Sequence, residues 1–161
     1  IKHTEYKDED TFFVNLGKPV FWHEDFPKNS LELEGLKLNF VSIGNPHAVA
    51  FVKDLDQYDR LTPGPKIENN KNFPNKINFE LVAEVTPNKF KVKVWERGCG
   101  VTLACGTGAT AVYAVLRKLK NVPKEITINL PGGKLSFSEN ENGEILMQGE
   151  AKSVYFGMIE T

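Results

Sequence analysis

Short runs of alternating apolar and polar residues dominate the chain, and this period of two predicts β-strands. Turn sequences separate the runs, for example Gly44-Asn45-Pro46 and Pro131-Gly132-Gly133, and such tight connections join antiparallel neighbours. The pattern therefore indicates a mostly antiparallel sheet. We expect strands over Phe12 to Leu16, Leu36 to Ile43, Ala48 to Val52, Ile77 to Val85, Lys89 to Trp95, Glu125 to Leu130, Lys134 to Phe137, Glu144 to Met147 and Val154 to Met158.

The pattern changes to a long helical period once, from about Gly106 to Lys120, where apolar residues and alanines recur at helical spacing. Asn121 fits a left-handed cap, and Pro123 prevents continuation of the helix. Shorter helical turns are predicted over residues 54–61 and 66–70, followed by a polar loop to residue 75. A single long apolar helix needs cover on several sides. The predicted fold is an α+β domain in which a mixed, largely antiparallel sheet wraps around a central helix.

Composition places the chain among globular proteins, because 40% of its residues are hydrophobic and 25% are charged. The net charge of -1 predicts no general attraction for nucleic acid or anionic membranes. No apolar run reaches the roughly 20 residues of a membrane span, and the first residues lack the pattern of a signal peptide. We therefore expect a cytoplasmic protein. The chain opens with Ile1 instead of Met, which suggests a processed, truncated or split product.

The segment from Trp95 to Ala109 leads from a predicted strand into the long helix and contains four glycines within eleven residues. Glycines allow the backbone to approach a ligand closely, and free N–H groups at a helix start bind anions such as carboxylate or phosphate. Cys105 lies at this helix start, where the positive end of the helix dipole favours a thiolate. We therefore expect the pKa of the Cys105 thiol to lie below its ordinary value.

Three interpretations of Cys105 remain open from these residues. It is a buried structural thiol, a part of a phosphate loop, or a nucleophile or acid–base group acting on a bound carboxylate. The phosphate loop is disfavoured because the segment lacks the Gly-Lys-Ser/Thr ending that contacts nucleotide phosphates and magnesium. Cys99 and Cys105 have neither the spacing nor the further ligands of a zinc site, so no metal is expected.

Polar residues at two other points are further candidates. Alternation in the strand before the turn places Glu96 on the face of Phe90, Val92 and Val94, toward a cleft, unless the strand ends at Trp95 and Glu96 is solvated. Arg97 provides a fork for a substrate carboxylate or forms a surface ion pair. Asn45 and His47 lie in a turn between two apolar strands, where a histidine is more often structural than catalytic.

Several short segments, spread over most of the chain, form an ordered set of motifs: Gly44-Asn45-Pro46-His47-Ala48-Val49, Gly64-Pro65, Ile67-Glu68, Phe73-Pro74 with Asn78, Trp95-Glu96-Arg97-Gly98, Ala104-Cys105-Gly106-Thr107-Gly108-Ala109, Gly132-Gly133-Lys134-Leu135 and Val154-Tyr155-Phe156-Gly157-Met158-Ile159. In order and approximate spacing, these segments resemble the C-terminal half of diaminopimelate epimerase, and the resemblance covers essentially the whole chain. The sequence departs from the family at Glu150, where Pro is usual, and at Cys99, where a small residue is common.

The resemblance implies a cofactor-independent epimerase that converts LL-diaminopimelate to meso-diaminopimelate, in lysine and cell-wall precursor biosynthesis. One thiolate removes the α-proton and an opposite thiol returns one. Cys105 is the thiol of this half, and the other belongs to the N-terminal half. The resemblance further implies that His47 and Glu96 adjust thiol protonation and that Glu96 also contacts substrate. Gly106 and Thr107 would bind the reacting carboxylate, and Asn45, Asn78 and Arg97 the distal groups.

The resemblance also predicts an organisation into two parts. Residues 1–152 would form the C-terminal epimerase domain, and residues 153–161 a closing strand that packs on the N-terminal half. The expected partners are diaminopimelate and that N-terminal half, with the oligomeric state, including a homodimer, left open. The alternatives are a related isomerase of the same fold that does not use pyridoxal phosphate, an acyl-transferring cysteine enzyme, and a catalytically silent fragment or binding module.

Overall fold

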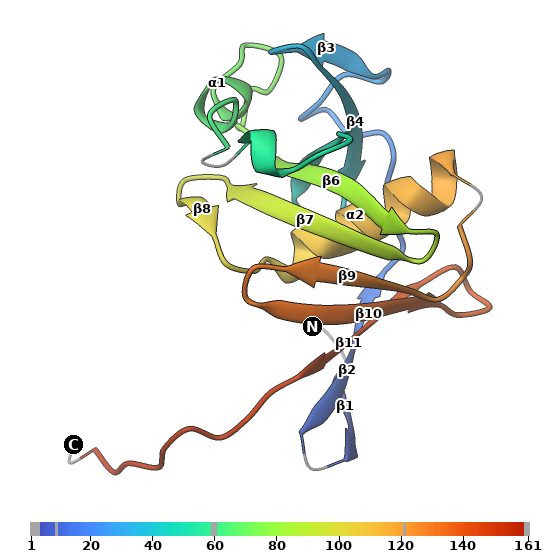
Figure 1. Cartoon of the computed structure of the whole chain (residues 1–161), viewed down its shortest axis with the longest axis vertical. Coiled ribbons are helices and arrows are strands. Elements are labelled where there is room, and N and C mark those ends of the chain that lie inside the picture. Colours follow the sequence, from blue (N-terminus) through green and yellow to red (C-terminus); the bar gives the residue numbers. More distant parts are fainter. Residues whose placement is uncertain (1–3, 9, 59–60, 121, 160–161) are drawn as a thin grey trace.

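A computed structural model describes residues 4–8, 10–58, 61–120 and 122–159 of the chain. Its strands form one sheet in the order β1-β2-β11-β10-β9-β7-β6-β5-β4-β3, with β8 paired to β7 beside this path (Figure 1). The strands are β1 (Thr4–Asp8), β2 (Thr11–Gly17), β3 (Leu31–Leu33), β4 (Leu36–Ser42), β5 (Pro46–Phe51), β6 (Asn78–Thr86), β7 (Lys89–Glu96), β8 (Gly100–Thr102), β9 (Ile126–Leu130), β10 (Gly133–Glu139) and β11 (Ile145–Glu150).

The sheet is mixed and largely antiparallel, as the turn sequences predict. Among the described strands only β5·β6 and β7·β9 pair in parallel. The connection between β5 and β6 contains a short 3-10 helix, Asp56–Tyr58, and helix α1, Gly64–Glu68. The connection between β7 and β9 contains β8 and the long helix α2, Gly106–Leu119. Parallel neighbouring strands need such long crossover connections, and the helices of the described residues lie within these two connections.

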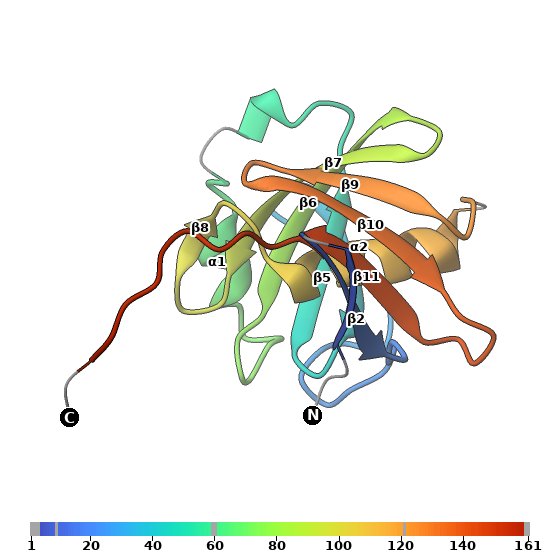
Figure 2. The same cartoon turned by 90° about the horizontal axis from the view of Figure 1, so that it is seen from below.

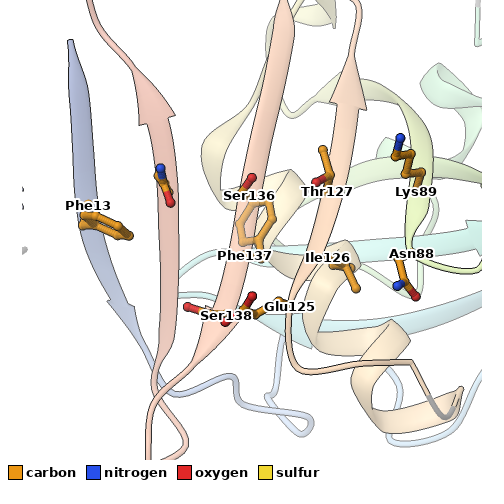
Figure 3. Close-up of a pocket in the computed structure, with 10 residues that line it drawn as sticks. Phe13, Asn88, Lys89, Glu125, Ile126, Thr127, Ser136, Phe137 and Ser138 are labelled. Atoms are coloured by element: carbon orange, nitrogen blue, oxygen red, sulfur yellow. The ribbon is translucent and has the colours of Figure 1, made fainter. Parts of the chain in front are cut away.

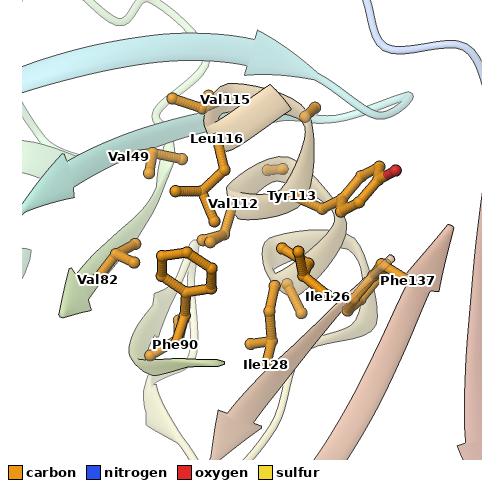
Figure 4. Close-up of a cluster of buried hydrophobic side chains, with 14 of the residues drawn as sticks. Val49, Val82, Phe90, Val112, Tyr113, Val115, Leu116, Ile126, Ile128 and Phe137 are labelled. Carbon is orange, nitrogen blue, oxygen red and sulfur yellow. The ribbon is translucent and has the colours of Figure 1, made fainter. Parts of the chain in front are cut away.

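Helix α2 packs against β4, β5, β6, β10 and β11. Nine of its residues are buried, from Gly108 to Leu116. Figure 4 shows Val112, Tyr113 and Leu116 turned toward aromatic and branched side chains of the strands, including Phe90 and Phe137. The Tyr113 and Phe137 rings stack with their centroids 5.6 Å apart. This cluster is the main core, and because it buries α2 from its third residue onward, it fixes the position of the helix start.

A second hydrophobic cluster lies on the opposite face of β4, β5 and β6. The alternation along β5 is clear, since Val49 belongs to the α2 cluster while Ala48 and Ala50 belong to the second one. Ile67 of α1 and Phe73 are buried in this second cluster. Strands β4 to β6 are therefore covered on both faces, which is why their sequences read as nearly continuous apolar runs.

Two points of the sequence analysis need correction, and a third lies outside the described residues. Strands β1, β3 and β8 were not expected, because they are short or mostly polar. The predicted strand Val154 to Met158 is wrong, since residues 151–159 have no regular structure, are exposed, and extend away from the body in both views (Figures 1 and 2). Helix α2 ends at Leu119 with Lys120 as its cap, and the predicted cap Asn121 lies outside the described residues. None of the helices in the described ranges could cross a membrane.

Candidate active site

Cys105 occupies the N-cap of α2, as the sequence predicts. Its backbone is extended, and its sulfur accepts a hydrogen bond of 3.4 Å from the Gly108 N–H. The Thr107 hydroxyl lies 3.5 Å from the same sulfur. Gly106 and Thr107, the first two helical residues, are half-buried. The first N–H groups of a helix have no partner within it, so these two remain available to an anion beside the thiol.

The electrostatic environment of Cys105 differs from the expectation. Burial raises the pKa of the Cys105 thiol, and hydrogen bonds from Thr107 and Gly108 act in the opposite direction without outweighing it. The charges of Glu80 and Glu96 raise this pKa further. Only 8% of the residue is exposed. The prediction of a lowered thiol pKa is therefore wrong for this chain, in which the resting sulfur is protonated at neutral pH.

A buried carboxylate and histidine lie next to the thiol. His47 Nδ1 is 2.7 Å from Glu80 Oε1, and neither residue is exposed to solvent. Burial raises the pKa of Glu80, His47 lowers it, and Glu96 raises it. Sequence reasoning missed Glu80, although a charged residue inside the apolar run of β6 was a visible signal. A Cβ placed on Gly108 would be 2.8 Å from Glu80 Oε1, so this carboxyl group faces the first turn of α2.

Asn45 connects the buried pair to the helix start. Its Oδ1 is 3.0 Å from His47 Nε2, and its Nδ2 donates to the Thr107 hydroxyl at 3.4 Å. Polar contacts therefore run without interruption from Glu80 through His47, Asn45 and Thr107 to the sulfur of Cys105. The sequence analysis placed four of these five residues in one site, and the structure brings all five together.

Asn78 and Arg97 are held at the neighbouring turn. The buried amide of Asn78 donates to the Pro46 carbonyl at 2.8 Å and accepts from the Arg97 N–H at 2.9 Å. The exposed Arg97 side chain donates to the Asn75 carbonyl at 2.9 Å. In this chain Asn78 therefore positions the backbone on both sides of the site, while its predicted contact with substrate remains a prediction.

Glu96 belongs electrostatically to the thiol site, because its charge acts on both Glu80 and Cys105. It ends β7 half-buried, on the face of buried Phe90, Val92 and Val94, as alternation predicts. Strand β7 continues through Glu96, so the alternative that the strand stops at Trp95 is wrong.

Helix α1 holds this end of β7 in place. Glu68 Oε2 accepts from the Trp95 indole N–H at 2.8 Å, and Oε1 accepts from the Gly98 N–H at 2.9 Å. Burial opposes ionisation of Glu68, but these hydrogen bonds, together with the nearby Lys76 ammonium, outweigh burial and lower the pKa of the carboxyl group. Gly64 lies so close to the Trp95 ring that a Cβ would approach it to 2.4 Å. The turn that carries Glu96 and Arg97 is thus held at Trp95 before it and at Gly98 after it.

The described residues include no group of three or more His, Cys, Asp or Glu residues arranged for a metal ion. A 530 Å³ pocket lies over β9 and β10 (Figure 3), but none of the residues around Cys105 lines it. Ser136, Phe137 and Ser138 of β10 line this pocket together with Ile126 and Thr127 of β9.

Known proteins resemble this chain in sequence over most of its length. The sequence profile of the diaminopimelate epimerase family matches residues 39–154. The chain is 40% identical to the diaminopimelate epimerase of Halothermothrix orenii over 94% of this chain and 58% of that protein. It is 41% identical to the enzyme of Methanothermobacter thermautotrophicus, over 99% of this chain and 62% of that protein. The chain thus spans less than two thirds of these relatives.

Solved structures share the fold at low sequence identity. A Bacillus anthracis protein of the phenazine biosynthesis PhzF family superposes with a TM-score of 0.63 at 15% identity, over 94% of this chain and 62% of that one. A hydroxyproline epimerase from Agrobacterium vitis gives a TM-score of 0.62 at 12% identity, over 88% of this chain and 50% of that one. These likenesses concern the fold alone, whereas the sequence profile and the relatives near 40% identity are more specific. On that basis the chain belongs to the diaminopimelate epimerase family.

Proposed function

We propose that this chain is the active-site half of a cofactor-independent epimerase that interconverts LL- and meso-diaminopimelate, and that it contributes one of two thiols. The observation that carries the proposal is Cys105 at the N-cap of α2, beside the half-buried Gly106 and Thr107. An amino-acid α-proton is weakly acidic, so negative charge developing at the α-carbon and carboxylate requires stabilisation. Backbone N–H groups at a helix start supply that stabilisation without a cofactor.

The two-thiol mechanism requires one sulfur to be protonated and the other to be a thiolate at the start of each turnover. The raised pKa of Cys105 makes it the protonated partner in the resting state. It returns a proton to the substrate carbanion, and in the reverse direction the resulting thiolate removes one. His47 and Glu96 adjust this protonation state, because one belongs to the polar chain that ends at the sulfur and the other acts on the thiol through its charge.

Substrate recognition is assigned to the residues around the thiol. Gly106 and Thr107 bind the reacting carboxylate through their N–H groups, and Glu96 contacts the substrate nearby. Asn45, Asn78 and Arg97 bind the distal amino and carboxylate groups. Support for Arg97 comes from its exposed guanidinium, which still has N–H donors beyond the one bound to Asn75.

The second thiol and the rest of the substrate pocket belong to an N-terminal half that acts as the partner of this chain. In the proposed organisation residues 1–152 form the C-terminal domain and residues 153–161 pack on that partner. Five large apolar side chains of this segment support the assignment, since each is at least 83% exposed: Val154, Tyr155, Phe156, Met158 and Ile159. We further propose that the completed sheet wraps α2.

An acyl-transferring cysteine enzyme is the alternative that the site disfavours. A nucleophilic cysteine acts as a thiolate, and such sites lower the thiol pKa with a neighbouring cation or a helix end. Here burial and two carboxylates raise it. Mass spectrometry after incubation with thioester or amide substrates would detect an acyl adduct on Cys105, and we expect none.

The proposal is tested by isotope exchange in deuterated water. With diaminopimelate alone this chain should show no α-hydrogen exchange, because its site thiol is protonated at rest and the thiolate that removes the α-proton belongs to the other half. Addition of an N-terminal half that carries the other cysteine should start exchange and epimerisation together. Cys105→Ala should abolish epimerisation, because no thiol is left on this face of the α-carbon to return the proton, while the matched variant Cys99→Ala, at an exposed thiol, should retain exchange and epimerisation. Persistent epimerisation in the Cys105→Ala complex would refute the proposal.

A further inference from the structure

Glu80 is a buried carboxylic acid for which the mechanism above has no role. It is the third residue of β6, is not exposed at all, and its Oε2 has no hydrogen-bond partner among the described residues. Burying a carboxyl group with an unpaired oxygen costs free energy, so its presence in the core calls for an explanation. Its other oxygen, Oε1, is 2.7 Å from His47 Nδ1 and faces Gly108 in the first turn of α2.

The hydrogen-bond directions around His47 follow from the groups that cannot change roles. Asn45 presents Oδ1 to His47 Nε2, and a carbonyl oxygen only accepts, so Nε2 carries a hydrogen. The remaining proton of the pair then lies in the short contact between Nδ1 and Glu80 Oε1, on one atom or the other. In both arrangements Glu80 is the hydrogen-bond partner of Nδ1, and the hydrogen on Nε2 therefore stays directed at Asn45.

The same logic continues to the sulfur. With Oδ1 occupied by His47, the Asn45 amide donates through Nδ2 to Thr107 Oγ1. A hydroxyl that accepts there has its own hydrogen free to donate, and the sulfur of Cys105 lies 3.5 Å away. The sulfur thus accepts hydrogen bonds from the Thr107 hydroxyl and from the Gly108 N–H. If the Asn45 amide turned over, its oxygen would accept from Thr107 and that hydroxyl would be lost to the sulfur.

We propose that Glu80 is a positioning residue which, by fixing the Nε2–H form of His47, holds Asn45 and Thr107 in the orientation that donates a hydrogen bond to the Cys105 sulfur. In this role Glu80 acts through His47, and the hydrogen bonds to the sulfur come from Thr107 and Gly108. Its importance for epimerisation rests on the proposed function, but the orientation of the chain of hydrogen bonds does not. The measurements below therefore use this chain without a substrate or an N-terminal half.

The first test is imidazole ¹⁵N NMR of the wild-type chain, with the His47 signals assigned by comparison with His47→Gln. We expect Nε2 of His47 to carry a hydrogen, as its contact with Asn45 Oδ1 requires. An unprotonated Nε2 would overturn the proposal, and this result requires no variant at Glu80 to fold.

The second test compares Glu80→Gln with Glu80→Leu in a Cys99→Ser background, which leaves Cys105 as the single thiol. Both substitutions remove the same charge, so the Coulombic effect of Glu80 on the thiol cancels in the comparison. Glutamine can donate an N–H to His47 Nδ1 and preserve the Nε2–H form, whereas leucine cannot. The Glu96 carboxylate, the other titratable group acting on the thiol, is unchanged.

The readout is the pH dependence of Cys105 alkylation by iodoacetamide, followed by mass spectrometry. We expect the midpoint of Glu80→Leu to lie about one pH unit above that of Glu80→Gln, a tenfold slower reaction at a fixed lower pH, because a hydrogen bond to the thiolate is lost. The ¹⁵N spectrum of Glu80→Gln should match the wild type. Coincident midpoints for two folded variants would overturn the proposal, as would an Nε2 of His47 that loses its proton in Glu80→Gln.

Discussion

Gly108 provides a sharp test of how tightly the first turn of α2 is packed against the buried pair. A Cβ at this position would lie 2.8 Å from Glu80 Oε1, 3.3 Å from Cys105 Cβ and 3.4 Å from its sulfur. The carboxyl group cannot move aside freely, because it bonds to His47 at 2.7 Å and both side chains are fully buried. Gly108→Ala therefore forces either the helix start or the Glu80–His47 pair to shift.

The magnitude follows from two opposing effects. Alanine in place of glycine within a helix contributes about 1 kcal/mol through helix propensity. Overpacking a close-packed site costs about 1–3 kcal/mol, and weakening a buried hydrogen bond costs about 1–3 kcal/mol more. The clash exceeds the propensity gain, so we expect Gly108→Ala to reduce the free energy of unfolding by about 2 kcal/mol.

The matched control is Gly106→Ala two residues earlier in the same helix. Its Cβ would meet only Met147, at 3.5 Å, which is an ordinary van der Waals contact. Urea denaturation followed by far-ultraviolet circular dichroism measures both variants, and we expect Gly106→Ala to be neutral or slightly stabilising. If Gly108→Ala were as stable as Gly106→Ala, the close packing of Glu80 against the helix start would be refuted.

Three further predictions concern parts of the chain away from the thiol. Burial raises the pKa of Tyr113 to about 12, and its hydroxyl donates to the Lys124 carbonyl. Since an unfolded tyrosine ionises near pH 10, the free energy of unfolding should fall between about pH 10 and 12. Urea titrations at alkaline pH should show a smaller fall in Tyr113→Phe. Glu68→Ala removes the acceptor of the Trp95 indole and should cost about 1–3 kcal/mol, with a red-shifted tryptophan emission. Ending the chain at residue 152 should leave its melting temperature unchanged, because residues 153–159 are exposed, but should prevent association with an N-terminal half, measured by ultracentrifugation.

Alternation predicted the sheet well where one face of a strand is buried. In β7 the buried residues Phe90, Val92 and Val94 alternate with lysines, and the alternation correctly placed Glu96 on the inner face. The same reasoning failed for β1 and β8, because β1 is mostly polar and β8 is only three residues long. It also failed for Val154 to Met158, whose apolar residues suit a strand but have no neighbouring strand in the described part of the chain.

The helix start of the site could be read from the residues themselves, whereas Asn45 and His47 were placed there only by the family resemblance and Glu80 was missed. Cys105, Gly106 and Thr107 follow from a helix start after a glycine-rich turn, which is a local feature. The contact between His47 and Glu80 depends on the parallel register of β5 and β6, in which His47 lies opposite Asn78. These strands are separated by a long crossover, and no pattern in either one specifies their relative register.

The thiol pKa shows how this missing tertiary information can reverse a chemical conclusion. A helix end stabilises an anion by at most about 2 kcal/mol, which is about 1.5 pKa units, whereas burial shifts a pKa by up to several units. The sequence shows the helix start of Cys105, but the core that covers the sulfur and the carboxyl group of Glu80 appear only once the sheet has formed. The larger effect wins, so the pKa of the Cys105 thiol lies above its ordinary value and not below it. On the proposed mechanism the resting thiolate must then belong to the other half. That half would bind next to a Cys105 thiol whose pKa the surrounding buried residues have already raised.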